Sequence, residues 1–164
     1  MSESFLAPVA DLLTSTEGDY ESSGFHHRHV AEVGSTTAIA SAFAAAGYLL
    51  EMITCEDRRA DLKKMRVVYT FNRLPSSGAT GAADRHLLFI DVDEKAPAVS
   101  VCDVYAGANW LEREVFDMYG VTFDGHPELK RILLPDDADF HALLKDFGRM
   151  EDAPDTNDAD PDAR

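Results

Sequence analysis

The sequence predicts an α+β fold: a small mixed sheet with one main helix packed on it, followed by an extended C-terminal arm. Short runs rich in β-branched and aromatic residues alternate with turn-forming residues, which is typical of strands. An uncharged, alanine-rich stretch at 33–50 favours a helix that packs closely on a sheet. Beyond residue 120, apolar residues continue without the spacing of a regular element, which indicates an arm.

Composition narrows the function classes. The 164 residues are 45% hydrophobic and 27% charged, as expected for one globular domain with an extension. The formal net charge of −15 argues against a nucleic-acid partner, because phosphate binding needs clustered cations. The two cysteines, Cys55 and Cys102, are isolated, so we expect neither a metal cluster nor a disulfide framework, and they suit a reducing compartment.

Four segments are predicted: an N-terminal segment (1–24), the α+β domain (25–107), a helix with an extended docking arm (108–150), and a disordered acidic tail (151–164). The tail carries six acidic residues and one basic residue, with too little apolar surface to offset the entropy of ordering. We expect no signal peptide, because no basic region precedes the first apolar residues. Glycine, serine and threonine within 33–50 favour a buried helix over a membrane span.

The elements of the domain follow in order. Ser35 is a plausible N-cap for a helix over 36–46, and Gly47 supplies the left-handed residue after it. A polar loop is predicted at 75–85. The other predicted elements are a short helix at 5–13 and strands at 26–33, 48–54, 66–72, 86–92 and 98–104, the last two paired across a turn.

The segment from residue 108 to residue 120 predicts a second helix. Asn109 and Glu112 have the spacing of a capping box, and Gly120 can end the helix. Six of the ten residues at 110–119 are large and apolar, so the helix is buried or covered by a partner. Arg113 and Asp117 are then one of two things. They are either an exposed ion pair that stabilises the fold by about 0.3–0.5 kcal/mol, or desolvated charges, for which removal of one partner destabilises the fold by about 3–5 kcal/mol.

The sequence of the arm also predicts its conformation and its contacts. Pro127 favours extended geometry at His126, which is either a titrating group or, in the simpler interpretation, a hydrogen-bonded structural histidine. The apolar run at 132–134 is cut by Pro135 and has no regular element to pack into, so we expect residues 121–150 to be ordered only against a partner. A last helix is predicted over 138–147, with Phe140, Leu143, Leu144 and Phe147 on one stripe.

The residues from 108 to 137 resemble the signature of a known protein family. ANWLEREVFDMYG followed by F-x-GHP-x-L-x-RILLPDD, over 108–137, resembles the signature of the C subunit of proton-pumping NADH:quinone oxidoreductase (respiratory complex I). The resemblance implies an arm that docks on the quinone-site D subunit and other subunits of the hydrophilic arm. By position, it assigns these interface residues: Glu112, Arg113, Glu114, Asp117, His126, Pro127, Leu129, Arg131, Leu134, Pro135, Asp136 and Asp137.

The same resemblance implies a function. The chain is expected to be a non-catalytic, accessory and assembly subunit, peripheral on the cytoplasmic side of the inner membrane. It would hold no catalytic residue, cofactor or metal, while quinone, NADH and iron–sulfur clusters belong to the rest of the assembly. The alternative function is that of the corresponding subunit of an energy-converting membrane-bound hydrogenase. The least specific hypothesis is that the chain is a free-standing soluble domain. The family's G-H-P-L-R-K-D-like continuation is replaced here by HALLKDF at 141–147.

Other candidate metal-binding and catalytic residues have less support from the sequence. His26, His27 and His29 fall on both faces of the predicted strand, and no carboxylate or cysteine lies near them in the sequence to complete a metal set. Cys55 has no local base and is expected to be a packed thiol. The sequence also lacks a glycine-rich phosphate loop and the G-x-S-x-G and H-E-x-x-H motifs.

Overall fold

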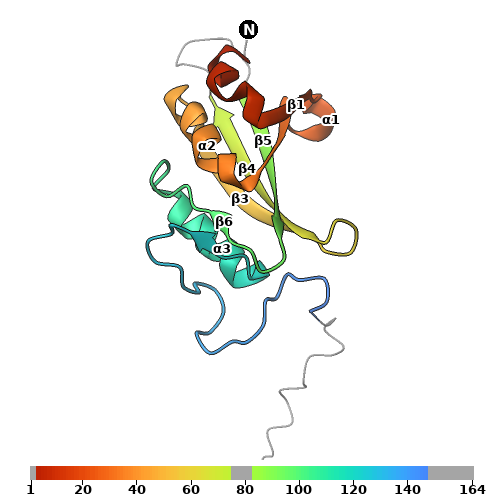
Figure 1. The fold of residues 1–164 in the computed structure, drawn as a ribbon, viewed down its shortest axis with the longest axis vertical. Coiled ribbons are helices and arrows are strands. Elements are labelled where there is room, and N and C mark those ends of the chain that lie inside the picture. Colours follow the sequence, from red (N-terminus) through yellow and green to blue (C-terminus); the bar gives the residue numbers. More distant parts are fainter. Residues whose placement is uncertain (1–2, 75–82, 148–164) are drawn as a thin grey trace, which may run out of the picture.

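A twisted five-stranded sheet is the centre of the fold (Figure 1). The computed structural model describes residues 3–74 and 83–147, so the predicted acidic tail and most of the predicted loop at 75–85 lie outside the described residues. The strands run in the order β1-β2-β5-β4-β3. Their bounds are β1 Leu13–Glu17, β2 His27–Ala31, β3 Leu49–Arg58, β4 Lys64–Arg73 and β5 Asp84–Asp93. Within this sheet, β2 and β5 pair in parallel and the other neighbouring strands pair antiparallel, which makes the sheet mixed, as predicted.

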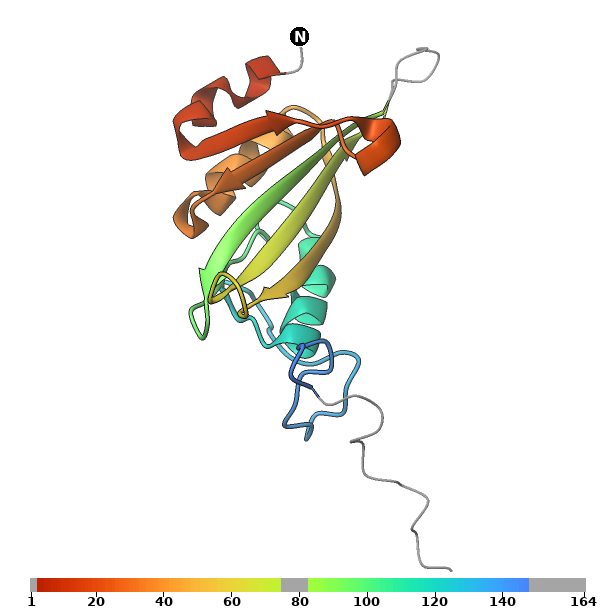
Figure 2. The ribbon, with the colours of Figure 1, turned by 90° about the vertical axis from the view of Figure 1, so that its right-hand side faces the viewer.

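Two helices, α2 (Thr36–Ala45) and α3 (Ala108–Tyr119), cover one face of this sheet (Figure 2). The core between the layers is apolar because alternate strand residues point toward the helices. Phe43 of α2 stacks on Phe71 of β4 with ring centroids 4.2 Å apart, and Val115 of α3 joins the same core. The α+β class, with its helices on one face of the sheet, is therefore confirmed.

The predicted helix at 36–46 and the strands at 26–33, 48–54, 66–72 and 86–92 are all present. Gly47 takes the predicted left-handed conformation, with φ 79°. Ser35 precedes α2 as predicted, but among the described residues the side chain that bonds at this end is that of Thr36, which donates to the carbonyl of Val33 at 2.7 Å. A 3₁₀ turn, η2 (Val33–Ser35), leads into the helix.

The N-terminal segment holds more structure than predicted. The helix expected at 5–13 is a 3₁₀ helix, η1 (Glu3–Leu12), and it leads directly into β1. This edge strand, LTSTE, is mostly exposed and has no apolar alternation, so the sequence pattern missed it. A one-turn helix, α1 (Tyr20–Ser23), follows, with the side chain of Asp19 accepting from an amide of its first turn.

The strand pair predicted from 86–92 and 98–104 is wrong. Only β6 (Ala98–Val99) is a strand, and it pairs in parallel with β7 (Phe123–Asp124) in a separate two-stranded sheet. The chain cannot continue as a strand because the amide of Val101 donates to the carboxylate of Glu112, and the amide of Tyr105 turns back to the carbonyl of Val101.

The helix predicted over 138–147 is also wrong, since this segment forms turns and bends. The carbonyls of Ala138 and Phe140, which a helix would bond internally, accept from the guanidinium of Arg131 instead. We call residues 121–147 the arm. It lies beside α3 at the end of the molecule opposite α1 and η1 (Figures 1 and 2).

Candidate functional site: the clamp between α3 and the arm

The carboxylate of Asp117 is the centre of a buried hydrogen-bond network between α3 and the arm. Its Oδ2 accepts from the backbone amides of Ile132, Leu133 and Leu134 at 2.9, 2.7 and 3.0 Å. Its Oδ1 accepts from Arg131 at 2.6 Å. Burial alone raises the pKa of Asp117, but the three amides and Arg131 outweigh burial and lower it to about 2. The side chain is therefore an anion that holds the arm by its backbone.

Arg113, one turn earlier on α3, holds the adjacent carbonyls. It donates to the backbone oxygens of Lys130 and Arg131 at 3.1 and 3.3 Å, and its guanidinium lies 4.9 Å from the ring centroid of Trp110. The predicted Arg113–Asp117 pair is wrong, because the partner of Asp117 is Arg131. Burial of both charges is confirmed, and each is compensated mainly by backbone groups of the arm.

Arg131 extends the network along the arm. Its Nη1 donates to both the carboxylate and the carbonyl of Asp117, and its Nη2 donates to the carbonyls of Ala138 and Phe140. The Nδ1 of His141 donates to the same carbonyl of Asp117 at 2.8 Å. We call Arg113, Asp117, Arg131 and His141 the clamp, because together they fix residues 130–141 to one helix.

The end of the arm is fixed to the sheet. The amide of Lys145 donates to Asp57, at the end of β3, at 3.0 Å. Arg59 pairs with both Asp57 and Asp146, at 2.7 and 2.6 Å. Hydrogen bonds from Arg59 and from two backbone amides hold the pKa of Asp57 well below its ordinary value. The HALLKDF segment, where the sequence departs from the family pattern, therefore docks on its own domain.

Glu112 does not form the predicted capping box. The helix begins at Ala108, so Asn109 lies inside it instead of capping it, and Glu112 is buried within it. Its carboxylate accepts from the amide of Val101 at 2.7 Å and from the thiol of Cys102 at 3.5 Å. Burial raises the pKa of Glu112. This side chain is buried within its own chain, where it positions the loop before the helix.

His126 is a hydrogen-bonded structural histidine, the simpler of the two interpretations of its sequence. Its Nδ1 accepts from the amide of Glu128, and its Nε2 donates to the carbonyl of Asn109 at 3.2 Å. His126 lies close enough to Cys102 and Glu112 for the three to hold a metal ion, with ligand atoms within 4.8 Å of one another. Both nitrogens of His126 already have backbone partners, however, which disfavours metal binding there.

The remaining predicted interface residues differ in how exposed their side chains are to solvent. Leu129 and Leu134 are half-buried, and Leu129 packs against the core. The exposed ones are Glu114, Pro127, Pro135, Asp136 and Asp137. The other predicted thiol, Cys55, is buried as expected, and burial raises its pKa to about 12.

Large apolar side chains remain exposed around the clamp. Trp110 on α3 is 64% exposed and Leu133 on the arm is 62% exposed. We call the set the outer patch: Trp110, Leu133, Phe140, Leu143 and Phe147. The rings of Phe140 and Phe147 stack with centroids 4.9 Å apart. Sequence reasoning assigned these phenylalanines to a helix stripe and did not identify them as part of a surface.

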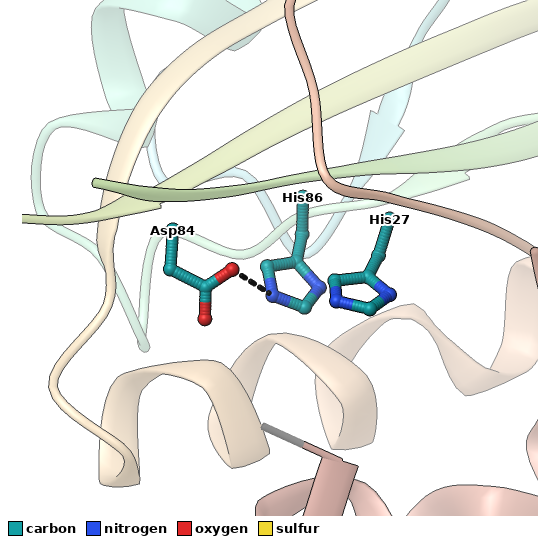
Figure 3. A group of neighbouring side chains, drawn as sticks. All are labelled: His27, Asp84 and His86. Atoms are coloured by element: carbon teal, nitrogen blue, oxygen red, sulfur yellow. Dashed lines mark hydrogen bonds and ion pairs between the residues drawn. The ribbon is translucent and has the colours of Figure 1, made fainter. Parts of the chain in front are cut away.

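A second polar cluster, which sequence reasoning missed, lies where β2 and β5 begin (Figure 3). His27 pairs in register with His86, and Asp84 lies two residues before His86 on the same face. One ligand atom from each lies within 4.8 Å of the others. The expectation that no carboxylate approaches these histidines is therefore wrong. The H-x-H and D-x-H spacings were a signal, but only the β2–β5 register joins them.

The neighbours of this cluster form a chain of hydrogen bonds. His86 Nε2 lies 3.1 Å from Asp84 Oδ1, and His86 Nδ1 lies 2.9 Å from His29 Nε2. His29 Nδ1 lies 2.8 Å from the hydroxyl of Ser15, and Tyr48 donates to Asp84 Oδ2 at 2.5 Å. Burial, and then the nearby histidines, lower the pKa of His29 to about 3. Burial also lowers that of His86, to about 4 despite Asp84, so both rings are neutral at pH 7.

Comparison with known proteins finds relatives among the subunits of NADH-quinone oxidoreductase. Over 60 residues, 37% of this chain and 29% of the relative, the chain is 53% identical to the C subunit of NADH-quinone oxidoreductase from Xanthobacter autotrophicus. Over 99 residues, 60% of this chain and 46% of the relative, it is 38% identical to NADH-quinone oxidoreductase subunit 5 of Thermus thermophilus. The chain therefore spans less than half the length of these curated relatives.

Two solved structures share the fold. A trypsin-resistant fragment of Nqo5 matches with a TM-score of 0.58 and 27% identity, over 71% of this chain and 89% of that chain. A chain of the membrane-bound sulfane sulfur reductase, an archaeal respiratory membrane complex, matches with a TM-score of 0.74 over 91% of this chain and 84% of that chain. At 17% identity, the second match shows the fold alone.

Within the described residues, the structure contains no helix that is both long and apolar enough to cross a membrane. The family described as "Respiratory-chain NADH dehydrogenase, 30 Kd subunit" matches residues 30–152, a range that takes in most of the domain, α3 with its clamp, and the arm. The family resemblance of the signature at 108–137 is thereby confirmed over most of the chain. This chain belongs to the family of the 30 kDa subunit of respiratory-chain NADH dehydrogenase.

Proposed function

We propose that this chain is a non-catalytic accessory and assembly subunit of a proton-translocating NADH (or related donor):quinone oxidoreductase. In this proposal, it lies in the hydrophilic arm, peripheral on the cytoplasmic side of the inner membrane, and docks on the quinone-site D subunit. The family and its named relatives support the type of complex. The observation that carries the docking role is the clamp, which fixes an irregular segment rigidly enough to present an apolar surface.

The clamp explains why a partner surface is expected on the arm. Loops that bind a partner lose conformational entropy on binding, and a segment held in place beforehand loses less. The backbone on both sides of Leu133 is fixed by Asp117 and Arg113, while the Leu133 side chain points away from that buried network and is 62% exposed. Buried charges are thus used to order the backbone, and the exposed apolar side chains are left for binding.

The composition of the outer patch suits a subunit interface. Aromatic residues are enriched at the energetically dominant positions of interfaces, and three of the five patch residues are aromatic. The exposed members of the predicted interface set, such as Pro135 and Asp136, can form a polar rim around it.

In this proposal, the chain supplies contacts and no redox group. An iron–sulfur cluster takes four ligands, usually thiolates, whereas this sequence has two cysteines. Cys55 is enclosed in the core and Cys102 bonds to Glu112, so each thiol has a packing role in the domain. The electron carriers would therefore belong to other subunits.

Affinity purification through a tag on this chain tests the proposal. Mild detergent extraction of membranes should yield a complex that contains the quinone-site D subunit and oxidises the donor with a quinone as acceptor. Recovery with hydrogenase catalytic subunits would replace the proposal with the energy-converting hydrogenase alternative. Recovery of a homogeneous monomer from gently extracted membranes would contradict both.

A further inference from the structure

We propose that His27, Asp84 and His86 form a binding site for a divalent transition-metal ion, with Zn²⁺ as the ion that suits it best (Figure 3). The site lies at the β1–β2–β5 side of the sheet, while the clamp joins α3 to the arm. It goes beyond the proposed function, because neither docking nor assembly requires a metal in this chain.

The spacing of two of the ligands already suits an ion. Bonds of about 2.0–2.2 Å that meet at 90–109° place two ligand atoms about 2.9–3.5 Å apart. His86 Nε2 and Asp84 Oδ1 are 3.1 Å apart. The ring of His27 stacks beside that of His86, with centroids 4.6 Å apart, and must rotate to direct a nitrogen at the same point. His27 is half-buried, and one of its ring nitrogens lies within 4.8 Å of a ligand atom of Asp84 and of His86 before any rotation.

The surrounding residues hold the ligands as the outer hydrogen-bonding partners do in metalloproteins. Tyr48 donates to Asp84 Oδ2, and Arg73 lies 3.4 Å from the same oxygen, so Oδ1 remains directed at His86. A histidine that binds a metal through one nitrogen usually donates its other N–H to a fixed acceptor. His86 Nδ1 faces His29 Nε2 at 2.9 Å, which supplies such an acceptor.

The chain of hydrogen bonds through His29 has two consistent proton arrangements. Without metal, His86 Nε2–H donates to Asp84, His29 Nε2–H donates to His86 Nδ1, and Ser15 donates to His29 Nδ1. With metal on His86 Nε2, every donor reverses: His86 Nδ1–H donates to His29 Nε2, and His29 Nδ1–H donates to Ser15. Both rings stay neutral in each arrangement, so a metal can replace the His86–Asp84 bond without leaving a buried donor unpaired.

The ligand set selects the class of ion. Imidazole with carboxylate suits Zn²⁺ and the neighbouring transition metals, whereas Mg²⁺ and Ca²⁺ require mainly oxygen ligands. Three protein ligands leave a fourth position for water or an exogenous group, and the half-buried side chains of His27 and Asp84 give access from solvent.

Calorimetric titration of the full chain, first freed of metal by a chelator, tests the site with Zn²⁺ and with Mg²⁺. We expect one Zn²⁺ per chain and no Mg²⁺. Asp84→Asn and His27→Gln should each weaken Zn²⁺ binding at least about tenfold. Two controls should bind as the unmodified chain does: His26→Gln, which removes a neighbouring histidine, and Cys102→Ser, which removes the thiol of the other candidate group.

Nitrogen-15 NMR of the histidine rings adds a readout that needs no variant. Zn²⁺ should exchange the tautomers of His86 and His29 together, since the chain of donors reverses. Unchanged His86 and His29 ring shifts at saturating Zn²⁺ would overturn the proposal, even if the variants failed to fold. So would the absence of Zn²⁺ binding by the folded chain, or binding lost in Cys102→Ser and kept in Asp84→Asn. Because both experiments use the isolated chain, they are independent of whether it joins the proposed complex.

Discussion

The carboxylate of Asp117 holds the arm through four hydrogen bonds. It faces three amides and one guanidinium from the arm, and it is buried. Asp117→Asn keeps the shape and removes the charge. We expect unfolding in urea to show a loss of about 3–5 kcal/mol, because the half-buried Arg131 and the three arm amides lose the buried anion that they bond to.

Glu114 provides the matched control for that prediction. It lies on the same helix and is exposed. Glu114→Gln should change the free energy of unfolding by no more than about 0.5 kcal/mol. Equal stability of the Asp117→Asn and Glu114→Gln variants would show that the clamp does not contribute to folding.

The lowered pKa of Asp117 makes the clamp sensitive to acid. Its folded-state pKa of about 2 lies below the ordinary value of 3.8. The stabilisation is therefore present above about pH 4 and is lost as the pH falls through 2, with a magnitude on the order of 2 kcal/mol. Urea unfolding at pH 5, 4, 3 and 2 should show the difference between the unmodified chain and Asp117→Asn shrinking toward low pH. A difference that is constant with pH would be evidence against an ionised, clamped carboxylate.

Alanine substitutions at Gly120 and Gly125 distinguish the cost of backbone strain from the cost of a steric clash. Both have positive φ, 76° and 81°. A Cβ at Gly120 would lie 2.8 Å from the ring of His141, while one at Gly125 would meet nothing within 4 Å. Alanine at either costs about 1–2 kcal/mol for the left-handed conformation. Thermal unfolding should show the larger loss for Gly120→Ala, and His141→Ala added to it should recover the excess. Equal losses at both glycines would mean that His141 does not pack on α3.

Among the elements, the arm differs most from its sequence-based prediction. Residues 121–150 were expected to be ordered only against a partner, because the apolar run at 132–134 has no regular element of its own to pack into. The structure gives the run a partner within its own chain, because its amides bond to Asp117 on α3.

We therefore expect the amides of residues 132–134 to exchange slowly with deuterium in the isolated chain. Asp117→Asn should speed their exchange while leaving the protection of β4 unchanged, since opening of the arm is a local event. Mass spectrometry of peptic fragments distinguishes the two regions. Fast exchange at 132–134 in the unmodified, isolated chain would restore the original expectation.

The errors of the sequence analysis share one physical cause. Strands β2 to β5 and helix α2 were predictable, because each buries a repeating apolar face that local spacing reveals. The conformations of 98–104 and 138–147 depend instead on two polar side chains, the buried Glu112 and the half-buried Arg131, that bond backbone groups several residues away. Composition indicated that charges lay on a buried helix, but the partner of Asp117 could not be found from i, i+4 spacing. The histidine cluster likewise needs the register between β2 and β5.

For the molecule as a whole, the domain acts as a scaffold that holds the arm in one place. The sheet positions α3, α3 holds the middle of the arm through the clamp, and Asp57 at the end of β3 holds its last described residues. This leaves the side chains of the outer patch exposed to solvent. We propose that the chain docks on its partner through this patch.

The measurement that tests this claim most directly compares two surface leucines. Leu133 lies in the outer patch and is 62% exposed, while Leu49 on β3 is 61% exposed and lies outside the arm. Leu133→Ser and Leu49→Ser should leave folding unchanged to within about 0.5 kcal/mol, because both side chains are largely in water. In membranes from cells that carry each variant, we expect Leu133→Ser to reduce both recovery of the assembled complex and donor:quinone reductase activity, and Leu49→Ser to reduce neither. Full assembly and activity with Leu133→Ser, or an equal loss with Leu49→Ser, would contradict the account.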